Sequence, residues 1–134
     1  MNNLTLISDF NTDILGRYLS NTKELSGFCI RNTPYAQVFQ NLLTPEGDDQ
    51  KESAVLLWTT PENVLKSYAE ALYYKPVDHE TVLDELDQYI DAVRSRAVNV
   101  KYLFHPSWVL PIGERGYGIL YYSQGLGLSN LLAR

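Results

Sequence analysis

The run Ala54-Val55-Leu56-Leu57-Trp58 is the feature of this sequence that most restricts the fold. It is apolar without alternation, which is typical of a strand buried on both faces, and such strands occur in parallel sheets covered by helices on each side. A second apolar run, Leu4-Thr5-Leu6-Ile7, is followed by a helical pattern and reads as a first βα unit. The two runs therefore predict a parallel α/β sheet with the 54–58 strand at a central position.

The rest of the chain alternates shorter strand and helix patterns. Further strands are predicted at 25–31 and 100–105, and helices at 14–19, 34–43, 61–72 and 77–98. A length of 134 residues is close to that of one domain. We therefore expect a single three-layer αβα domain over 1–134, with a doubly wound, mainly parallel sheet of strand order about 2-1-3-4.

The 77–98 pattern gives more detailed expectations for the longest helix. Asp78 is expected to cap it, and Ala97 is expected to face inward with the other apolar residues. Its charged residues, expected to face outward, are Asp84, Glu85, Asp87, Asp91, Arg94 and Arg96. Carboxylates at these spacings are normal on the outer face of an amphipathic helix, so no metal pair is assigned to them.

Polar side chains follow three of the predicted strands. Substrate-binding candidates are Ser8, Asp9, Asn11, Thr59, Thr60 and Ser107. In a sheet of order 2-1-3-4 the first and third strands are neighbours, so we expect these groups to converge in one crevice at the carboxyl ends. Asp9 and Asn11 would orient a bound polar group, to which the hydroxyls would donate. Thr60 has an alternative interpretation, because a Thr before Pro61 is also a helix N-cap.

Composition excludes several classes of function. Sixteen acidic and eleven scattered basic residues give a net charge of −5, which disfavours a nucleic-acid surface. The single Cys29, expected to be buried, and two distant histidines provide no metal-ligand set, so no metal site is predicted. No apolar run is long enough for a membrane helix, and the start of the chain does not resemble a secretory signal. We expect a cytoplasmic protein without membrane or nucleic-acid partners.

Two features near the carboxyl end bear on catalysis and on chain length. His105 and Ser107 share a strand face, but residues at i and i+2 are not placed for proton transfer, so no Ser–His dyad is predicted. The 113–118 segment is expected to form an irregular loop. The 125–134 segment begins a helical pattern that stops abruptly, and we expect these residues to be the amino-terminal part of a longer protein.

Five blocks of sequence together resemble the amino-terminal domain of FkbH-like proteins. They are Ile7-Ser8-Asp9-Phe10-Asn11-Thr12-Asp13-Ile14-Leu15, Pro34-Tyr35-Ala36-Gln37-Val38-Phe39-Gln40-Asn41-Leu42-Leu43, Leu57-Trp58-Thr59-Thr60-Pro61-Glu62, Ser107-Trp108-Val109-Leu110-Pro111 and Gly127-Leu128-Ser129-Asn130-Leu131-Leu132-Ala133. In that family the domain precedes a phosphatase domain of the haloacid-dehalogenase (HAD) superfamily, subfamily IIIC. The blocks cover nearly the whole chain in order.

The resemblance implies a fold similar to SGNH hydrolases and flavodoxin, and a place in polyketide or surface-glycan biosynthesis. In family members the magnesium-dependent HAD domain dephosphorylates a three-carbon donor and passes its glyceryl-type acyl group to an acyl carrier protein. The Asp-rich motif and the acyl-accepting cysteine of that domain are absent here. No cofactor is therefore expected in this chain, and Mg²⁺ is expected only for the HAD domain.

The residues that SGNH esterases use for catalysis are not matched in this sequence. Those enzymes carry Gly-Asp-Ser after the first strand, and aligning Asp9 with their Asp puts Phe10 at the position of the nucleophilic Ser. Ser8 would be a displaced nucleophile, but the chain has no Asp-x-x-His block to supply its base. No catalytic residue is therefore assigned.

Three hypotheses follow from the sequence. The first is a non-catalytic domain of an FkbH-like protein that presents substrate or an acyl carrier protein to a downstream HAD domain. The second is an SGNH-type esterase or acyl hydrolase, and the third is a binding or scaffold module without chemistry of its own.

Overall fold

A computed structural model describes residues 2–44 and 54–109 of the chain. The chain forms two compact units, one made of residues 1–59 and 90–107 and the other of residues 60–89 and 108–134. The first unit carries the sheet, and the second carries two short helices and the first part of the longest helix. Each unit is therefore described by itself.

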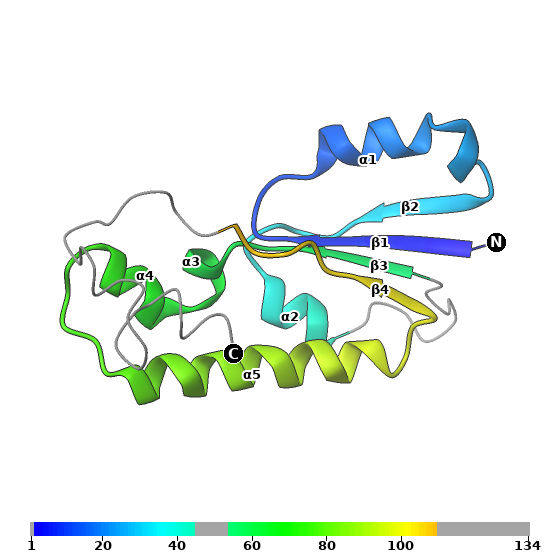
Figure 1. Ribbon diagram of the computed structural model, residues 1–134. Coiled ribbons are helices and arrows are strands. Elements are labelled where there is room, and N and C mark those ends of the chain that lie inside the picture. The colour runs from blue at the N-terminus through cyan, green and yellow to red at the C-terminus, as the bar shows by residue number, and fades with distance from the viewer. Residues whose placement is uncertain (1, 45–53, 110–134) are drawn as a thin grey trace. The chain divides into compact units, whose positions relative to one another are not determined.

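The first unit is built on a four-stranded parallel sheet (Figure 1). Its strands are β1 (Asn2–Ser8), β2 (Phe28–Asn32), β3 (Ala54–Trp58) and β4 (Tyr102–Phe104), in the order β2-β1-β3-β4. This confirms the predicted α/β class, the parallel sheet, its strand order and the central position of the 54–58 strand. The apolar runs indicated the parallel class, because strands buried on both faces occur in parallel sheets that helices cover on each side.

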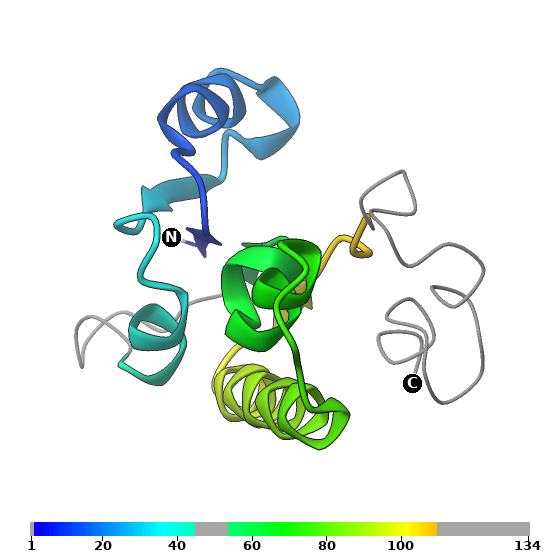
Figure 2. The ribbon, with the colours of Figure 1, turned by 90° about the vertical axis from the view of Figure 1, so that its left-hand side faces the viewer.

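Helices lie on both faces of this sheet. Helix α1 (Asp13–Ser20) and helix α2 (Val38–Leu43) lie on opposite sides of it, as Figures 1 and 2 show. On the α1 side Leu4, Leu6 and Ala54 form a buried cluster, against which Leu15 and Leu19 of α1 pack. The residues that alternate with them, Ile7, Val55 and Leu57, are 0% exposed, so the opposite face is covered too. The αβα layering is therefore as predicted.

Helix α1 turns only part of its apolar sequence toward the sheet. Ile14 and Tyr18 are 85% and 70% exposed, whereas the buried residue of the helix is Gly16. The four apolar residues of α1 fit one helical stripe by spacing alone, and packing selects Leu15 and Leu19 from it. Ile14 and Tyr18 therefore lie on the solvent side.

The segment around β2 differs from expectation in detail. A 3-10 helix, η1 (Lys23–Leu25), occupies the start of the run predicted as strand, so β2 begins later, at Phe28. Cys29 is exposed rather than buried, which corrects the prediction from its residue type. An edge strand has only one neighbour to cover its side chains, and β2 is at the edge of the described sheet.

Helix α2 begins at Val38 and not at Pro34, where the sequence placed its start. Ala36 has a φ of 60°, a left-handed conformation that a helix cannot contain. The side-chain amide of Asn41 donates to the carbonyl oxygen of Pro34 at 2.8 Å and holds this turn. Before it, the N–H and the hydroxyl of Thr33 both donate to the carbonyl oxygen of Leu6, at 3.1 and 2.7 Å. The local hydrogen bonds thus replace the expected first turn of helix.

In the second unit, the helix predicted over 61–72 is divided in two. Helix α3 (Pro61–Val64) ends at Leu65, whose φ of −115° and ψ of 99° are extended, and helix α4 (Lys66–Leu72) starts directly after it. Leu65 and Tyr68 are both 0% exposed. The break lets both short helices bury apolar side chains that one straight helix would direct elsewhere.

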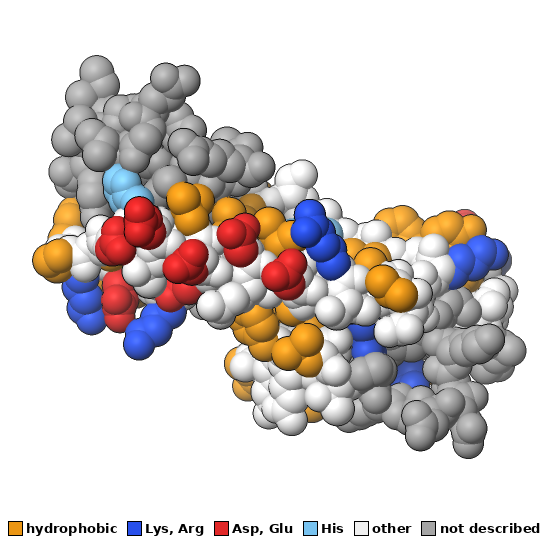
Figure 3. Space-filling model, turned by 90° about the horizontal axis from the view of Figure 1, so that it is seen from below, with side chains coloured by type: hydrophobic (Ala, Val, Ile, Leu, Met, Phe, Trp, Pro, Cys, Tyr) orange, Lys and Arg blue, Asp and Glu red, His pale blue; other side chains and the backbone are white. Residues whose placement is uncertain are grey.

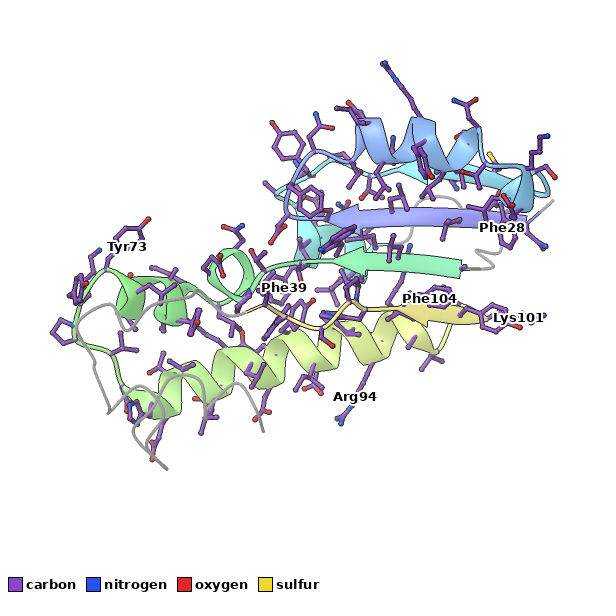
Figure 4. The ribbon with its side chains drawn as sticks, turned by 45° about the horizontal axis from the view of Figure 1, so that its top comes forward. Phe28, Phe39, Tyr73, Arg94, Lys101 and Phe104 are labelled. Atoms are coloured by element: carbon purple, nitrogen blue, oxygen red, sulfur yellow. The ribbon has the colours of Figure 1, made fainter. Side chains whose placement is uncertain are left out.

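Helix α5 (His79–Ala97) is the longest element, and it contributes residues to both units. Asp78 caps it as predicted, because its carboxylate accepts from the N–H of Glu80 at 3.3 Å and from the hydroxyl of Thr81 at 3.4 Å. Acidic side chains line its outer surface (Figure 3), and Arg94 points away from the helix (Figure 4). Two expectations were wrong: Arg96 is 2% exposed, and Ala97 is exposed. The last turn of α5 is therefore rotated relative to the apolar stripe read from the sequence.

Three sequence expectations lie outside the described residues: most of the 44–53 loop, the 113–118 loop and the 125–134 helix. Among residues 2–44 and 54–109, no helix combines the length and the apolar character that crossing a membrane requires.

Candidate functional site

The carboxyl ends of β1 and β3 lie side by side in the first unit. Ser8, the last residue of β1, is in register with Trp58, the last residue of β3, and Thr59 follows directly. From β1 the chain continues to β2 on one side, while β3 lies on the other side. This is the switch point of a doubly wound sheet, the place where ligands of such folds bind.

Ser8 is committed to the local backbone. It is 2% exposed, and its Oγ accepts a hydrogen bond from the backbone N–H of Phe10 at 3.0 Å. A buried hydroxyl held in a turn of this kind is the usual behaviour of Ser at a strand end. Ser8 therefore shapes the turn after β1, and its oxygen is not presented at the surface.

The two other candidates from this turn differ in exposure. Asn11 is exposed, and its Oδ1 accepts from the N–H of Asp13 at 2.8 Å. This bond satisfies one of the free donors at the start of α1, since the N-cap residue Thr12 makes no side-chain cap bond. Asp9 is half-buried, with its Oδ1 atom enclosed. Asn11 is therefore a capping residue.

The two threonines after β3 have different environments. Thr59 is 3% exposed and is the last residue of the 1–59 segment of the first unit. Thr60 is the N-cap residue of α3, followed by Pro61 at the first helical position, as the alternative interpretation predicted. Its hydroxyl bonds with the side-chain amide of Asn63 at 3.0 Å, and its carbonyl oxygen accepts from the Asn63 N–H at 3.2 Å. Thr60 thus initiates the second unit.

Ser107 is exposed and lies three residues after the end of β4. Nδ1 of His105 lies 2.8 Å from the carbonyl oxygen of Pro106, to which it donates in the matching tautomer. The imidazole is therefore directed to its neighbour's backbone and not to Ser107. In the described part of the chain no hydrogen bond joins Ser107 to the ends of β1 and β3.

Two aromatic residues that were not among the candidates occupy the surface of this edge. Phe10 and Trp58 are 38% and 41% exposed, and their rings meet edge to face, with centroids 5.5 Å apart and planes at 82°. The only signal in the sequence was their position: Trp58 is the last residue of β3, and Phe10 lies two residues after the end of β1. We call these two residues the aromatic corner.

The chemistry available at this edge is binding through rings and charge. The hydroxyl of Ser8 is buried, and the amide of Asn11 is used as a cap. Among residues 2–44 and 54–109, no three His, Cys, Asp or Glu side chains are grouped so that they could hold a metal ion. The edge therefore offers two exposed aromatic residues in edge-to-face contact, whereas Ser8 and Thr59 at the two strand ends are buried.

No family model matches the chain, and no curated protein and no solved structure matches it either.

Proposed function

We propose that this chain is a non-catalytic domain of an FkbH-like biosynthetic protein that presents an acyl carrier protein, or the substrate it carries, to a HAD-type phosphatase and acyl transferase domain. The pathway class is polyketide or surface-glycan biosynthesis, with a three-carbon, glyceryl-type acyl group. The binding surface is the edge formed by the ends of β1 and β3.

One observation carries the non-catalytic part of the proposal. At the strand end where an SGNH esterase has its serine nucleophile, the ring of Phe10 packs against Trp58, and Ser8 is buried as the acceptor for the Phe10 N–H. A nucleophile needs an accessible oxygen and a base within hydrogen-bond reach. This turn presents a ring instead of an accessible hydroxyl.

The binding part of the proposal is supported by location and by surface chemistry. The edge is the switch point of a doubly wound sheet, where ligands bind in this architecture. Aromatic side chains are enriched at protein interfaces, because they bury a large area with few rotatable bonds. Phe10 and Trp58 are already held against each other, so binding would cost little side-chain entropy.

The test is a calorimetric titration of the full chain with a holo acyl carrier protein that bears a glyceryl group on its pantetheine thiol. We expect saturable binding, weakened about tenfold or more in Trp58→Ala, since a central aromatic anchor is worth more than about 1.4 kcal/mol. Tyr102→Ala is the matched control, because Tyr102 is also exposed but lies on β4. Absence of binding to the carrier protein and to a separately produced HAD domain would overturn the proposal.

The esterase alternative has its own test. Turnover of short-chain aryl esters, together with fluorophosphonate labelling that Ser8→Ala removes, would replace the proposed function by a hydrolase. We expect no labelling at Ser8, because the buried Oγ has no approach path for the probe.

A further inference from the structure

We infer that the aromatic corner of Phe10 and Trp58 binds a small organic ammonium group. This inference goes beyond the proposed function and does not depend on it. It concerns the ligand chemistry that the exposed rings and the surrounding charge can recognise.

The aromatic corner has a defined shape. Two rings at 82° with centroids 5.5 Å apart stand nearly perpendicular, and Phe10 and Trp58 are each more than a third exposed as residues. Perpendicular aromatic walls are the geometry with which proteins enclose alkylammonium groups, since a cation is attracted to the negative faces of the rings. The corner therefore offers a ligand the exposed parts of two rings that are already fixed at a right angle.

The two segments that carry the rings hold acidic residues and no basic ones. Asp9 directly precedes Phe10, and Asp13 follows in the first turn of α1, where its carboxylate contacts only an uncharged group in the described part, the amide of Asn32 at 3.5 Å. The sequence has no Lys or Arg from residue 2 to residue 16, nor from residue 54 to residue 65. Both segments that form the corner thus carry negative charge or none, which favours a cation and disfavours phosphate or carboxylate ligands.

Hydroxyl groups at this edge are not the main contact for a ligand. Ser8 and Thr12, two residues either side of Phe10, and Thr59, which follows Trp58, are 2%, 5% and 3% exposed. A ligand that approaches this edge therefore meets rings before it meets hydroxyl donors. Ligands that depend on many hydrogen bonds are less suited to it than a compact ammonium.

The experiment compares choline with its uncharged isostere, 3,3-dimethylbutan-1-ol, in titrations of the full chain followed by the indole N–H resonances of the tryptophans in NMR spectra. Trp108→Phe assigns the resonance of Trp58. We expect choline to shift the Trp58 signal with a midpoint at least about fivefold lower than the alcohol, as one cation–π contact of about 1 kcal/mol requires. Equal midpoints, or no shift with either compound, would overturn the inference.

Variants separate the corner from other exposed rings. Phe10→Leu keeps an apolar residue but removes one wall, and should weaken choline binding about fivefold or more. Phe104→Leu makes the same change at an exposed ring on β4 and should leave the binding unchanged. If Phe10→Leu and Phe104→Leu have equal effects, the inference fails.

The outcome is distinguishable from that of the proposed function. Loss of the choline preference with carrier-protein binding intact overturns only the ammonium site. Loss of carrier-protein binding with the choline preference intact overturns only the proposed function.

Discussion

The carboxylate of Glu85 closes the N-terminus of helix α4 at Ser67. One oxygen accepts from the backbone N–H of Ser67 and the other from its hydroxyl, both at 2.9 Å. Helix α4 follows Leu65, an apolar residue that cannot cap it, so its first N–H groups need an acceptor from elsewhere. A residue expected on the outer face of α5 therefore fixes the break between α3 and α4.

Glu85→Ala should destabilise the protein by about 1 to 2 kcal/mol, because it removes the side-chain cap and leaves the donors of the buried Ser67 unsatisfied. Urea unfolding followed by circular dichroism measures this change. Asp84→Ala is the matched control, since Asp84 is exposed on the same helix and should change the free energy of unfolding by less than about 0.5 kcal/mol. Equal effects of the two substitutions would show that the cap contributes nothing.

A second prediction concerns the close approach of α1 to β2. A Cβ on Gly16 would lie 2.6 Å from both Nδ2 and Oδ1 of Asn32. Ala is favoured over Gly in a helix by about 1 kcal/mol, but here Asn32 must first move away from that Cβ. We therefore expect Gly16→Ala to be more favourable in an Asn32→Ala background than in the natural sequence, by about 1 kcal/mol.

The measurement for this pair is a double-mutant cycle from urea midpoints at constant m-value. Asn32 is exposed, so its own substitution should have a small effect. If Gly16→Ala changes stability equally in both backgrounds, the side chain of Asn32 moves aside without cost and is not what restricts position 16.

The sheet was predictable, and the contacts between elements were not. Ala54 to Trp58 and Leu4 to Ile7 indicated a parallel sheet, because burial on both faces leaves an uninterrupted apolar run in the sequence. The order 2-1-3-4 was expected from the doubly wound fold class, and the structure has it. The role of Glu85 depends on how α4 and α5 pack against each other. The spacing of apolar residues along α5 gives no information about this packing. Arg96 was expected to face outward and is buried, for the same reason. The spacing of apolar residues predicts which face of a helix is buried, but the packing of the helix decides where that buried face ends.

The candidate site was predictable in location but not in chemistry. Ser8 and Thr59 were chosen as strand-end hydroxyls, and both lie at the neighbouring ends of β1 and β3. Side-chain direction at a strand end depends on the turn, and the turn after β1 buries Ser8 while it exposes Phe10. From residue type alone, Ser8 was expected to face a ligand, and Phe10 was not among the candidates.

Cys29 provides a test of the exposed position of β2. The chain has one cysteine, and its side chain is exposed. We expect one equivalent of thiol per chain to react with Ellman's reagent in the absence of denaturant, and Cys29→Ser to abolish the reaction with little effect on stability. A thiol that reacts only in denaturant would contradict the placement of this side chain.

The contact between Ser8 and Phe10 predicts a structural and not a catalytic effect of substitution. Ser8→Ala removes the acceptor of the Phe10 N–H and should destabilise the protein by about 1 kcal/mol, the usual net value of such a bond. Ser107→Ala is the control, because Ser107 is exposed and should change the urea midpoint hardly at all. Ester turnover should be at background in the natural protein and in both variants. A Ser8→Ala protein of unchanged stability would mean that the hydroxyl does not hold the turn, and the ring of Phe10 would then owe its position to Trp58 alone.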